Sequence, residues 1–179
     1  MEKKVFGYPK YDDNGEMILT TYENEYRDML MDIRVYKLEK NQTKIFTSDD
    51  EEIAALLLNG KIEINVDGIE KVVSRKSVFL EGPYAGHVSH SKIISVKALE
   101  ETEILVQKTK NKVTFNSKLY TPEDAPWKYS SQGWYGNVAN RRVNTIIDHD
   151  IEPKSNMVLG EVLNDPGNWS GYLPHRHPQ

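Results

Sequence analysis

The chain has 179 residues, of which 38% are hydrophobic and 28% are charged, a balance typical of a folded protein. Its 23 basic and 27 acidic residues give a net charge of -4 and form no basic stripe, which excludes a nucleic-acid partner. The longest apolar run, 53–58, is too short to cross a membrane, and no apolar signal segment follows Met1, so we expect a cytoplasmic protein without membrane partners. The chain has no cysteine, which excludes disulfides and thiolate metal sites.

The first predicted elements follow an N-terminal segment, 1–27. From 28 to 35, apolar and polar residues alternate, broken only by Leu30, which predicts a strand with one buried face. The segment 49–58 could form a helix, because Ser48 could cap it and Glu51 follows three residues later. We favour a strand there, because the apolar residues lead directly into Asn59-Gly60 and a further alternating segment.

A hairpin is predicted around Asp67-Gly68. The preceding residues 61–66 alternate, and Asp-Gly favours a two-residue hairpin turn because both central positions tolerate positive φ. Further short strands are predicted at 72–73, 77–80, 93–99 and 104–106. Residues 28–109 are therefore expected to form one antiparallel unit.

The composition changes after Thr109. Residues 110–140 combine asparagine, proline and glycine with isolated aromatic residues, which predicts a long linker loop packed on a surface. Strands are predicted again at 141–147 and 156–163. Many short strands separated by turn residues favour an all-β fold of the sandwich or jelly-roll type.

The spacing His175-Arg176-His177 has a direct chemical interpretation. Residues two apart in a strand lie on one face, so both imidazoles can point into one cavity and bind one cation. Two ligands do not complete a catalytic site, because zinc-type sites take about three protein ligands. A histidine pair near a chain end is by itself more often a surface pair.

The other histidines fit a metal site less well. His87 and His90 are three apart and would face opposite sides of a strand, so we interpret them as loop or surface residues. His149 is interpreted as a solvated residue before the turn at Pro153. We therefore expect the unit 28–109 to hold no metal.

The residues around the histidine pair resemble a known family. The block Gly167-Asn168-Trp169-Ser170-x-Tyr172-x-Pro174-His175-x-His177 resembles the second-domain opening of the 5-deoxy-glucuronate isomerases, bicupin enzymes of myo-inositol degradation. Two earlier pieces agree with it: Arg142-Val143-x-x-Ile146 and Leu159-Gly160-Glu161-Val162. Three others resemble the first cupin of that family, which carries no metal: Glu52 to Gly60, Asp67-Gly68, and Arg75-x-Ser77-Val78-Phe79-x-x-Gly82-Pro83.

The resemblance covers about residue 29 to the last residue, and it implies a cupin-type jelly roll. Residues 28–109 would form a complete, metal-free first cupin, 110–140 a linker, and 141–179 the start of a second, incomplete cupin. The related uronate ketol-isomerases share the fold and the His-x-His, but match 167–170 less well.

The implied activity is that of an aldose–ketose isomerase acting on a uronate sugar. His175 and His177 would be ligands of a divalent cation such as zinc or manganese. The family pattern continues with a glutamate and a later histidine, which would lie beyond Gln179. We therefore expect the chain to be either a fragment that is inactive alone or a natural short form, with a homo-oligomer possible.

Arg141 and Arg142 are candidates for binding the substrate carboxylate, because a guanidinium matches the geometry of that group. As neighbours in a strand they point to opposite faces, so at most one can face a cavity. The alternative for each is a surface ion pair.

A different class of function is a metal-free cupin that binds a sugar or dimerises. Cupin-like folds host many functions, so the fold alone does not choose between these interpretations, whereas metal analysis does.

Overall fold

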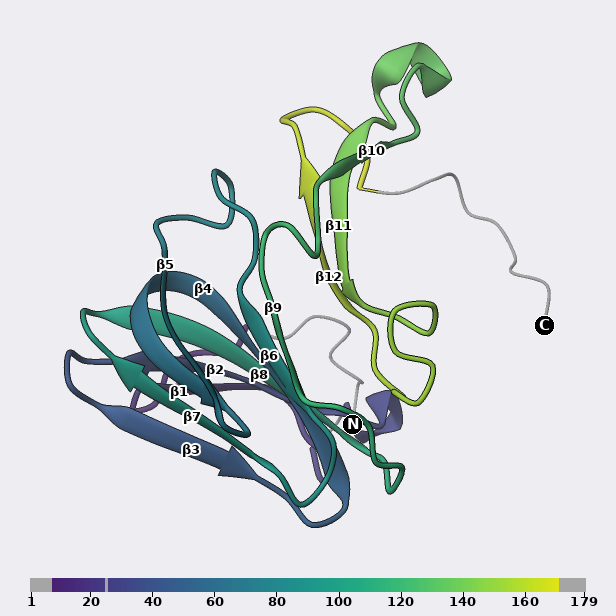
Figure 1. The fold of residues 1–179 in the computed structure, drawn as a ribbon. Helices are drawn as coiled ribbons and strands as arrows, with labels where there is room; N and C mark the ends of the chain where they lie inside the picture. The colour runs from purple at the N-terminus through teal and green to yellow at the C-terminus, as the bar shows by residue number, and fades with distance from the viewer. Residues whose placement is uncertain (1–7, 25, 171–179) are drawn as a thin grey trace, which may run out of the picture.

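The computed structural model describes residues 8–24 and 26–170 (Figure 1). Its first part is a sandwich of antiparallel strands, which pair in the order β1-β2-β8-β4-β6-β9 on one side and β3-β7-β4-β5 on the other. The bounds are β1 Glu16–Thr20, β2 Asp32–Leu38, β3 Thr43–Thr47, β4 Glu51–Val66, β5 Ile69–Arg75, β6 Ala85–Val88, β7 Ile93–Ala98, β8 Thr102–Lys110 and β9 Lys118–Tyr120. The all-β fold expected from the sequence is confirmed.

A second, three-stranded sheet rises from one side of the sandwich (Figure 1). It consists of β10 Lys128–Ser130, β11 Arg141–Ile147 and β12 Leu159–Asn164, in that order. Two short 3₁₀ helices, η1 Arg27–Met29 and η2 Trp134–Asn137, complete the elements. Neither helix of the described residues is long and apolar enough to cross a membrane.

Strand β4 belongs to both sheets of the sandwich. Residues 51–59 pair with β6 and β8, whereas residues 60–66 pair with β5 and β7. The register shifts between Leu57 and Asn59, and Gly60 has φ +104°. A bulge of this kind bends the strand and allows it to pass from one sheet to the other. The predicted strand at 49–58 is therefore confirmed, and Asn59-Gly60 is a bend within it.

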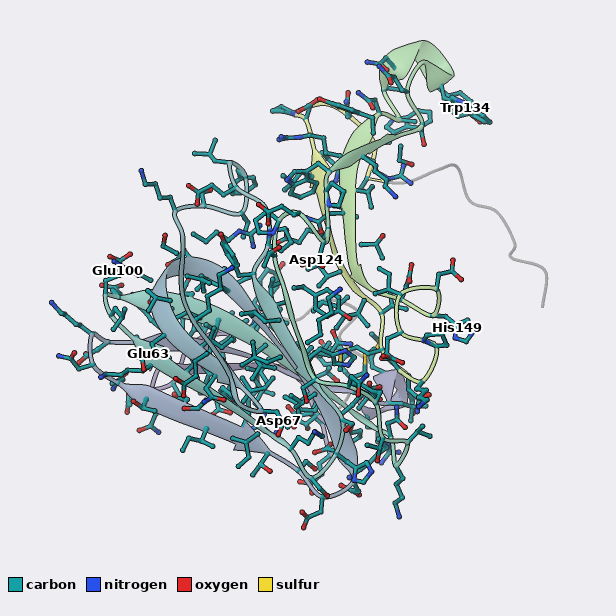
Figure 2. All side chains as sticks on the ribbon, in the orientation of Figure 1. Glu63, Asp67, Glu100, Asp124, Trp134 and His149 are labelled. Atoms are coloured by element: carbon teal, nitrogen blue, oxygen red, sulfur yellow. The ribbon has the colours of Figure 1, made fainter. Side chains whose placement is uncertain are left out.

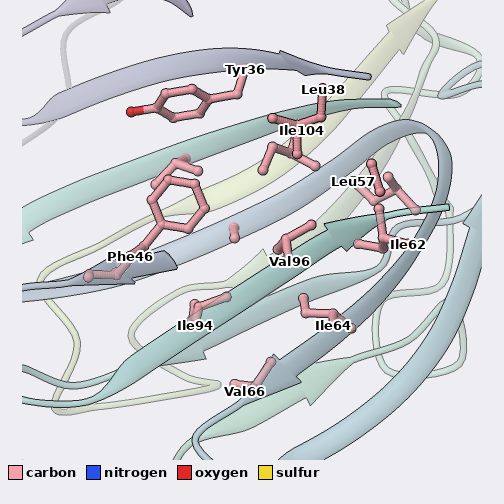
Figure 3. Packing of buried hydrophobic residues seen from close by; sticks show 14 of the residues in the cluster. Tyr36, Leu38, Phe46, Leu57, Ile62, Ile64, Val66, Ile94, Val96 and Ile104 are labelled. Atoms are coloured by element: carbon pink, nitrogen blue, oxygen red, sulfur yellow. The ribbon is translucent and has the colours of Figure 1, made fainter. Parts of the chain in front are cut away.

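The bend also changes which residues face the interior. Odd-numbered Ile53, Ala55 and Leu57 point inward before it, and even-numbered Ile62, Ile64 and Val66 after it. With residues of the facing strands they form the apolar core of the sandwich (Figure 3). The interior is thus filled by apolar side chains, which offer no metal ligand.

A substitution at the bend is expected to be costly. A methyl group at Gly60 would overlap the Thr102 hydroxyl and lie 2.7 Å from the Glu101 carbonyl oxygen, and the positive φ adds strain. Gly60→Ala should therefore lower the free energy of unfolding by about 3 kcal/mol, measured by urea unfolding. Gly68→Ala is the control: it also has a positive φ but nothing within 4 Å, and should lose only about 1 kcal/mol. Equal losses would contradict the steric explanation.

Other predicted elements are confirmed or corrected. The Asp67-Gly68 hairpin is confirmed, with Val66 paired to Ile69 and φ of 51° and 94° at the turn. The predicted strand 77–80 is wrong, because the amides of Leu80 and Glu81 both donate to the Ser77 carbonyl and form a turn. The strand predicted from residue 28 begins at Asp32, after η1.

Strands also occur in two segments for which no strand was predicted. The N-terminal segment 1–27 contributes β1, and 110–140 contributes β9, β10 and η2. Strand β9 pairs with β6, so the beginning of the predicted linker completes the sandwich. The predicted division into domains stays a prediction.

Candidate functional site

A buried ion pair joins the sandwich to the second sheet. Arg75, at the end of β5, is fully buried and forms a bidentate pair with Glu161 of β12, with both N–O distances 2.8 Å. Its guanidinium also donates to the carbonyl oxygens of Leu57 and Glu81. These contacts use the five N–H donors of an arginine, so the buried cation is fully hydrogen-bonded.

The same glutamate organises the second sheet. Asn144 of β11 donates from Nδ2 to Glu161 Oε2 at 3.0 Å, and its Oδ1 accepts from the Glu161 amide at 3.0 Å. Asn144 is 1% exposed. Arg75, Glu161 and Asn144 therefore fix which face of β11 and β12 turns toward the sandwich.

A second buried polar cluster is centred on Glu52 of β4. Its carboxylate accepts from the Ser155 hydroxyl (2.8 Å), the Asn156 amide (2.7 Å) and Nε2 of His87 (3.1 Å). Because a carboxylate only accepts, Nε2 of His87 carries the proton. Glu52 and His87 are 0% and 1% exposed, so the pair is buried away from solvent.

Aromatic rings enclose this pair. His87 lies with its ring centroid 4.6 Å from that of Phe115 and 6.5 Å from that of Tyr120. Burial, with smaller contributions from nearby carboxylates, raises the pKa of Tyr120 to about 12. The Glu52 cluster therefore lies in a dry environment, where it connects the segment before β12 to the sandwich.

Apolar residues pack between the two clusters. Ala54 and Leu56 on the outer side of β4 belong to a cluster with buried residues from β9 and the loop after it, from β11, and from β12 and the segment before it. These are Tyr120, Ala125, Ile146, Ile147, Met157 and Leu159. The second sheet is thus held to the sandwich by one apolar cluster and two buried polar clusters.

The two candidate arginines lie on β11. The Arg142 guanidinium is 5.8 Å from the ring centroid of Trp127, and Arg142 shares a face with Asn144, the face toward the sandwich. Arg141 lies on the opposite face, where Nη1 donates to the Ala139 carbonyl at 3.4 Å. Their role in substrate binding stays a prediction.

An exposed aromatic group lies at the tip of the second sheet. Tyr135 packs against Trp169, with centroids 5.3 Å apart, and against Trp134, with centroids 6.2 Å apart. Figure 2 labels Trp134 at this tip, far from the sandwich. The exposed fractions of the three residues range from 40% to 57%.

The predicted metal ligands His175 and His177 lie outside the described residues. Within residues 8–24 and 26–170, no three histidine or acidic side chains are grouped to hold a metal. His149 is exposed, as predicted, and lies in the loop between β11 and β12 (Figure 2). The interpretation of His87 as a loop or surface residue is wrong, since it is buried on β6.

Residues 7–179 match the model of the KduI/IolB family. The chain belongs to the KduI/IolB family. It is 30% identical over 173 residues to the 5-deoxy-glucuronate isomerase of Geobacillus kaustophilus, an alignment that covers 93% of this chain and 59% of the relative. It is 29% identical over 185 residues to the 5-deoxy-glucuronate isomerase of Geobacillus thermodenitrificans, an alignment that covers 100% of this chain and 64% of that relative. This KduI/IolB chain thus spans about three fifths of the length of these curated relatives.

Solved structures resemble this KduI/IolB member in fold. An IolB-like protein from Salmonella typhimurium LT2 aligns with a TM-score of 0.65 and 17% identity over 77% of this chain and 52% of that one. The putative glyoxylate-induced protein from Pseudomonas aeruginosa aligns with a TM-score of 0.61 and 7% identity over 87% of this chain and 59% of that one. The predicted cupin-type jelly roll is confirmed.

Sequence reasoning missed both buried polar clusters in this KduI/IolB chain. A signal for Glu52 was present, because the run 53–58 is apolar on both strand faces and so predicts burial of both. A glutamate directly before such a run lies on a buried face and needs hydrogen-bond donors. The sequence gives no comparable signal for the pairing of Arg75 with Glu161.

Proposed function

We propose that the chain is part of a 5-deoxy-glucuronate isomerase, which converts 5-deoxy-glucuronate to 5-dehydro-2-deoxy-gluconate in myo-inositol degradation. The observation that carries this proposal is the family match over residues 7–179, which includes His175-x-His177, together with relatives that bear this name. The substrate is a uronate sugar, and a cytoplasmic location and a homo-oligomer belong to the same proposal.

The reaction moves one proton from C2 to C1 of the sugar and a second from the C2 hydroxyl to the C1 oxygen, so the C1 aldehyde becomes an alcohol and the C2 alcohol a ketone. A divalent cation, zinc or manganese, would stabilise negative charge on the two oxygens. His175 and His177 are of the right type to hold it, since a nitrogen of neutral imidazole is a common ligand of divalent metal ions in proteins. Further ligands would come from residues beyond Gln179.

The packing of the sandwich supports a site in the second unit. The interior of the first unit is occupied by apolar side chains, and its buried His87 is bound to Glu52. The clusters of Arg75 and Glu52 would then hold the second unit in place on the sandwich.

The test compares the 179-residue chain with a longer version that carries the remaining residues of the Geobacillus kaustophilus relative. Both are given the same divalent metal, and formation of the ketose from 5-deoxy-glucuronate is measured together with bound metal. We expect turnover and stoichiometric metal in the longer version only, and loss of both after His175→Ala with His177→Ala. Comparable turnover by the short chain would contradict the proposed fragment, whereas sugar binding without turnover by either version would favour a metal-free binding module.

A further inference from the structure

The chain contains two asparagine–glycine steps, Asn14-Gly15 and Asn59-Gly60. In such a step the backbone nitrogen of the glycine can attack the side-chain carbonyl carbon of the asparagine, because glycine has no side chain to obstruct the approach. The attack requires the carboxamide and the following peptide group to rotate into contact. The local structure therefore decides which of the two steps can react.

The first step lies in the exposed turn that leads into β1. The Asn14 side chain is exposed, and its Nδ2 is 3.5 Å from Asp12 Oδ2, a distance at the limit of a hydrogen bond. The Gly15 amide donates to the Asp12 carbonyl at 3.0 Å, a contact within the turn itself. Both groups are thus released when this short turn opens, and an exposed turn opens at a small cost in free energy.

The second step lies at the bend of β4, between neighbouring strands. Asn59 Nδ2 donates to Glu103 Oε2 of β8 at 2.7 Å, and Gly60 is buried and pairs with Arg75 of β5. The space around Gly60 is filled, since an added methyl group would overlap the Thr102 hydroxyl. Rotation at this step requires the separation of strands, which costs far more free energy than the opening of a turn.

We propose that Asn14 is a site of spontaneous deamidation in the folded protein and that Asn59 is protected. The Gly15 backbone nitrogen loses its proton to a base and bonds to Cγ of Asn14. The Cγ–Nδ2 bond then breaks, ammonia leaves, and a cyclic imide remains. One water molecule opens the imide at either of its carbonyl carbons, which gives aspartate or isoaspartate. The balance is one water consumed and one ammonia released, so no cofactor takes part.

The modification changes both the charge and the backbone of the turn. Either product adds a negative charge among Asp12, Asp13 and Glu16, and isoaspartate also lengthens the main chain by one methylene group. The same turn fixes the start of β1 to β2, because the Lys37 amide donates to the Gly15 carbonyl at 2.7 Å. Since β1 lies at the edge of its sheet, isoaspartate at this position loosens that strand without breaking the core.

The test follows both steps during incubation of the folded 179-residue chain at neutral pH. Trypsin separates them, because Asn14 lies in the peptide 11–27 and Asn59 in the peptide 45–61. Mass spectrometry detects the exchange of NH₂ for OH, and an isoaspartyl methyltransferase labels the isoaspartate. We expect deamidation at Asn14 to be at least about tenfold faster than at Asn59, and faster at higher pH because the attacking nitrogen must lose its proton.

The chain unfolded in guanidinium chloride is the control for the role of structure, and there both steps should react at similar rates. Asn14→Gln should abolish the fast reaction and leave that of Asn59 unchanged. After incubation, the Lys37 amide should exchange its hydrogen faster in the original chain than in Asn14→Gln. The proposal is wrong if Asn14 reacts no faster than Asn59 in the folded chain, or if Asn14 reacts only after unfolding. Equal exchange of Lys37 in the two incubated proteins would overturn the proposed loosening of β1.

Discussion

Replacing Arg75 with methionine is expected to lower the free energy of unfolding by about 3–5 kcal/mol, because Glu161 would stay buried without its cation. The pair is almost completely buried, with side-chain exposures of 0% for Arg75 and 11% for Glu161. The Leu57 and Glu81 carbonyls would lose their donors as well. Thermal unfolding followed by circular dichroism should show a midpoint lower by on the order of 10 °C.

The control for Arg75→Met is Lys37→Met. Lys37 pairs with Glu101 at 2.8 Å, but the two side chains are 48% and 70% exposed, so water screens the pair. Its loss should leave the unfolding midpoint unchanged. Replacing both partners, Arg75→Met with Glu161→Leu, should recover much of the stability, because no buried charge remains. A loss after Arg75→Met as small as that of the control would show that the buried pair is not needed to hold the second sheet.

Replacing Glu52 with alanine is expected to cost about 3–4 kcal/mol of unfolding free energy, because three donors would lose their acceptor in a dry environment. These are the Ser155 hydroxyl, the Asn156 amide and the His87 imidazole. Two of them belong to the segment that leads into β12. The amide of Asn156 should therefore lose its protection from hydrogen exchange, measured by NMR or mass spectrometry.

Glu63→Ala is the control for this change, since Glu63 lies on the same strand but is exposed (Figure 2). It should leave both the unfolding midpoint and the exchange of Asn156 unchanged. If Glu52→Ala destabilised the protein while the Asn156 amide stayed protected, Glu52 would stabilise the sandwich rather than its connection to the second sheet.

The sequence by itself determined the fold class and the family. Alternation over 61–66 and the Asp67-Gly68 turn indicate a hairpin, because period-two alternation buries one face of a strand. The apolar run 53–58 has no such period, and the strand there was favoured because the run leads directly into Asn59-Gly60 and that hairpin. The block 167–177 indicated the family, which the match over residues 7–179 confirms. The strand at 77–80 was predicted wrongly because its apolar residues Val78, Phe79 and Leu80 fit a strand, whereas the chain turns there.

Only the tertiary structure decided how the two sheets are joined. Arg75 and Glu161 are 86 residues apart, and Glu52 and Asn156 are 104 apart, so no local pattern relates them. Their pairing depends on the path of β4 through both sheets and on β11–β12 packing against its outer side. The same packing placed Arg142 on the inner face and Arg141 on the outer face. Alternation requires the two arginines to face opposite ways, but only a neighbouring surface determines which way each one faces.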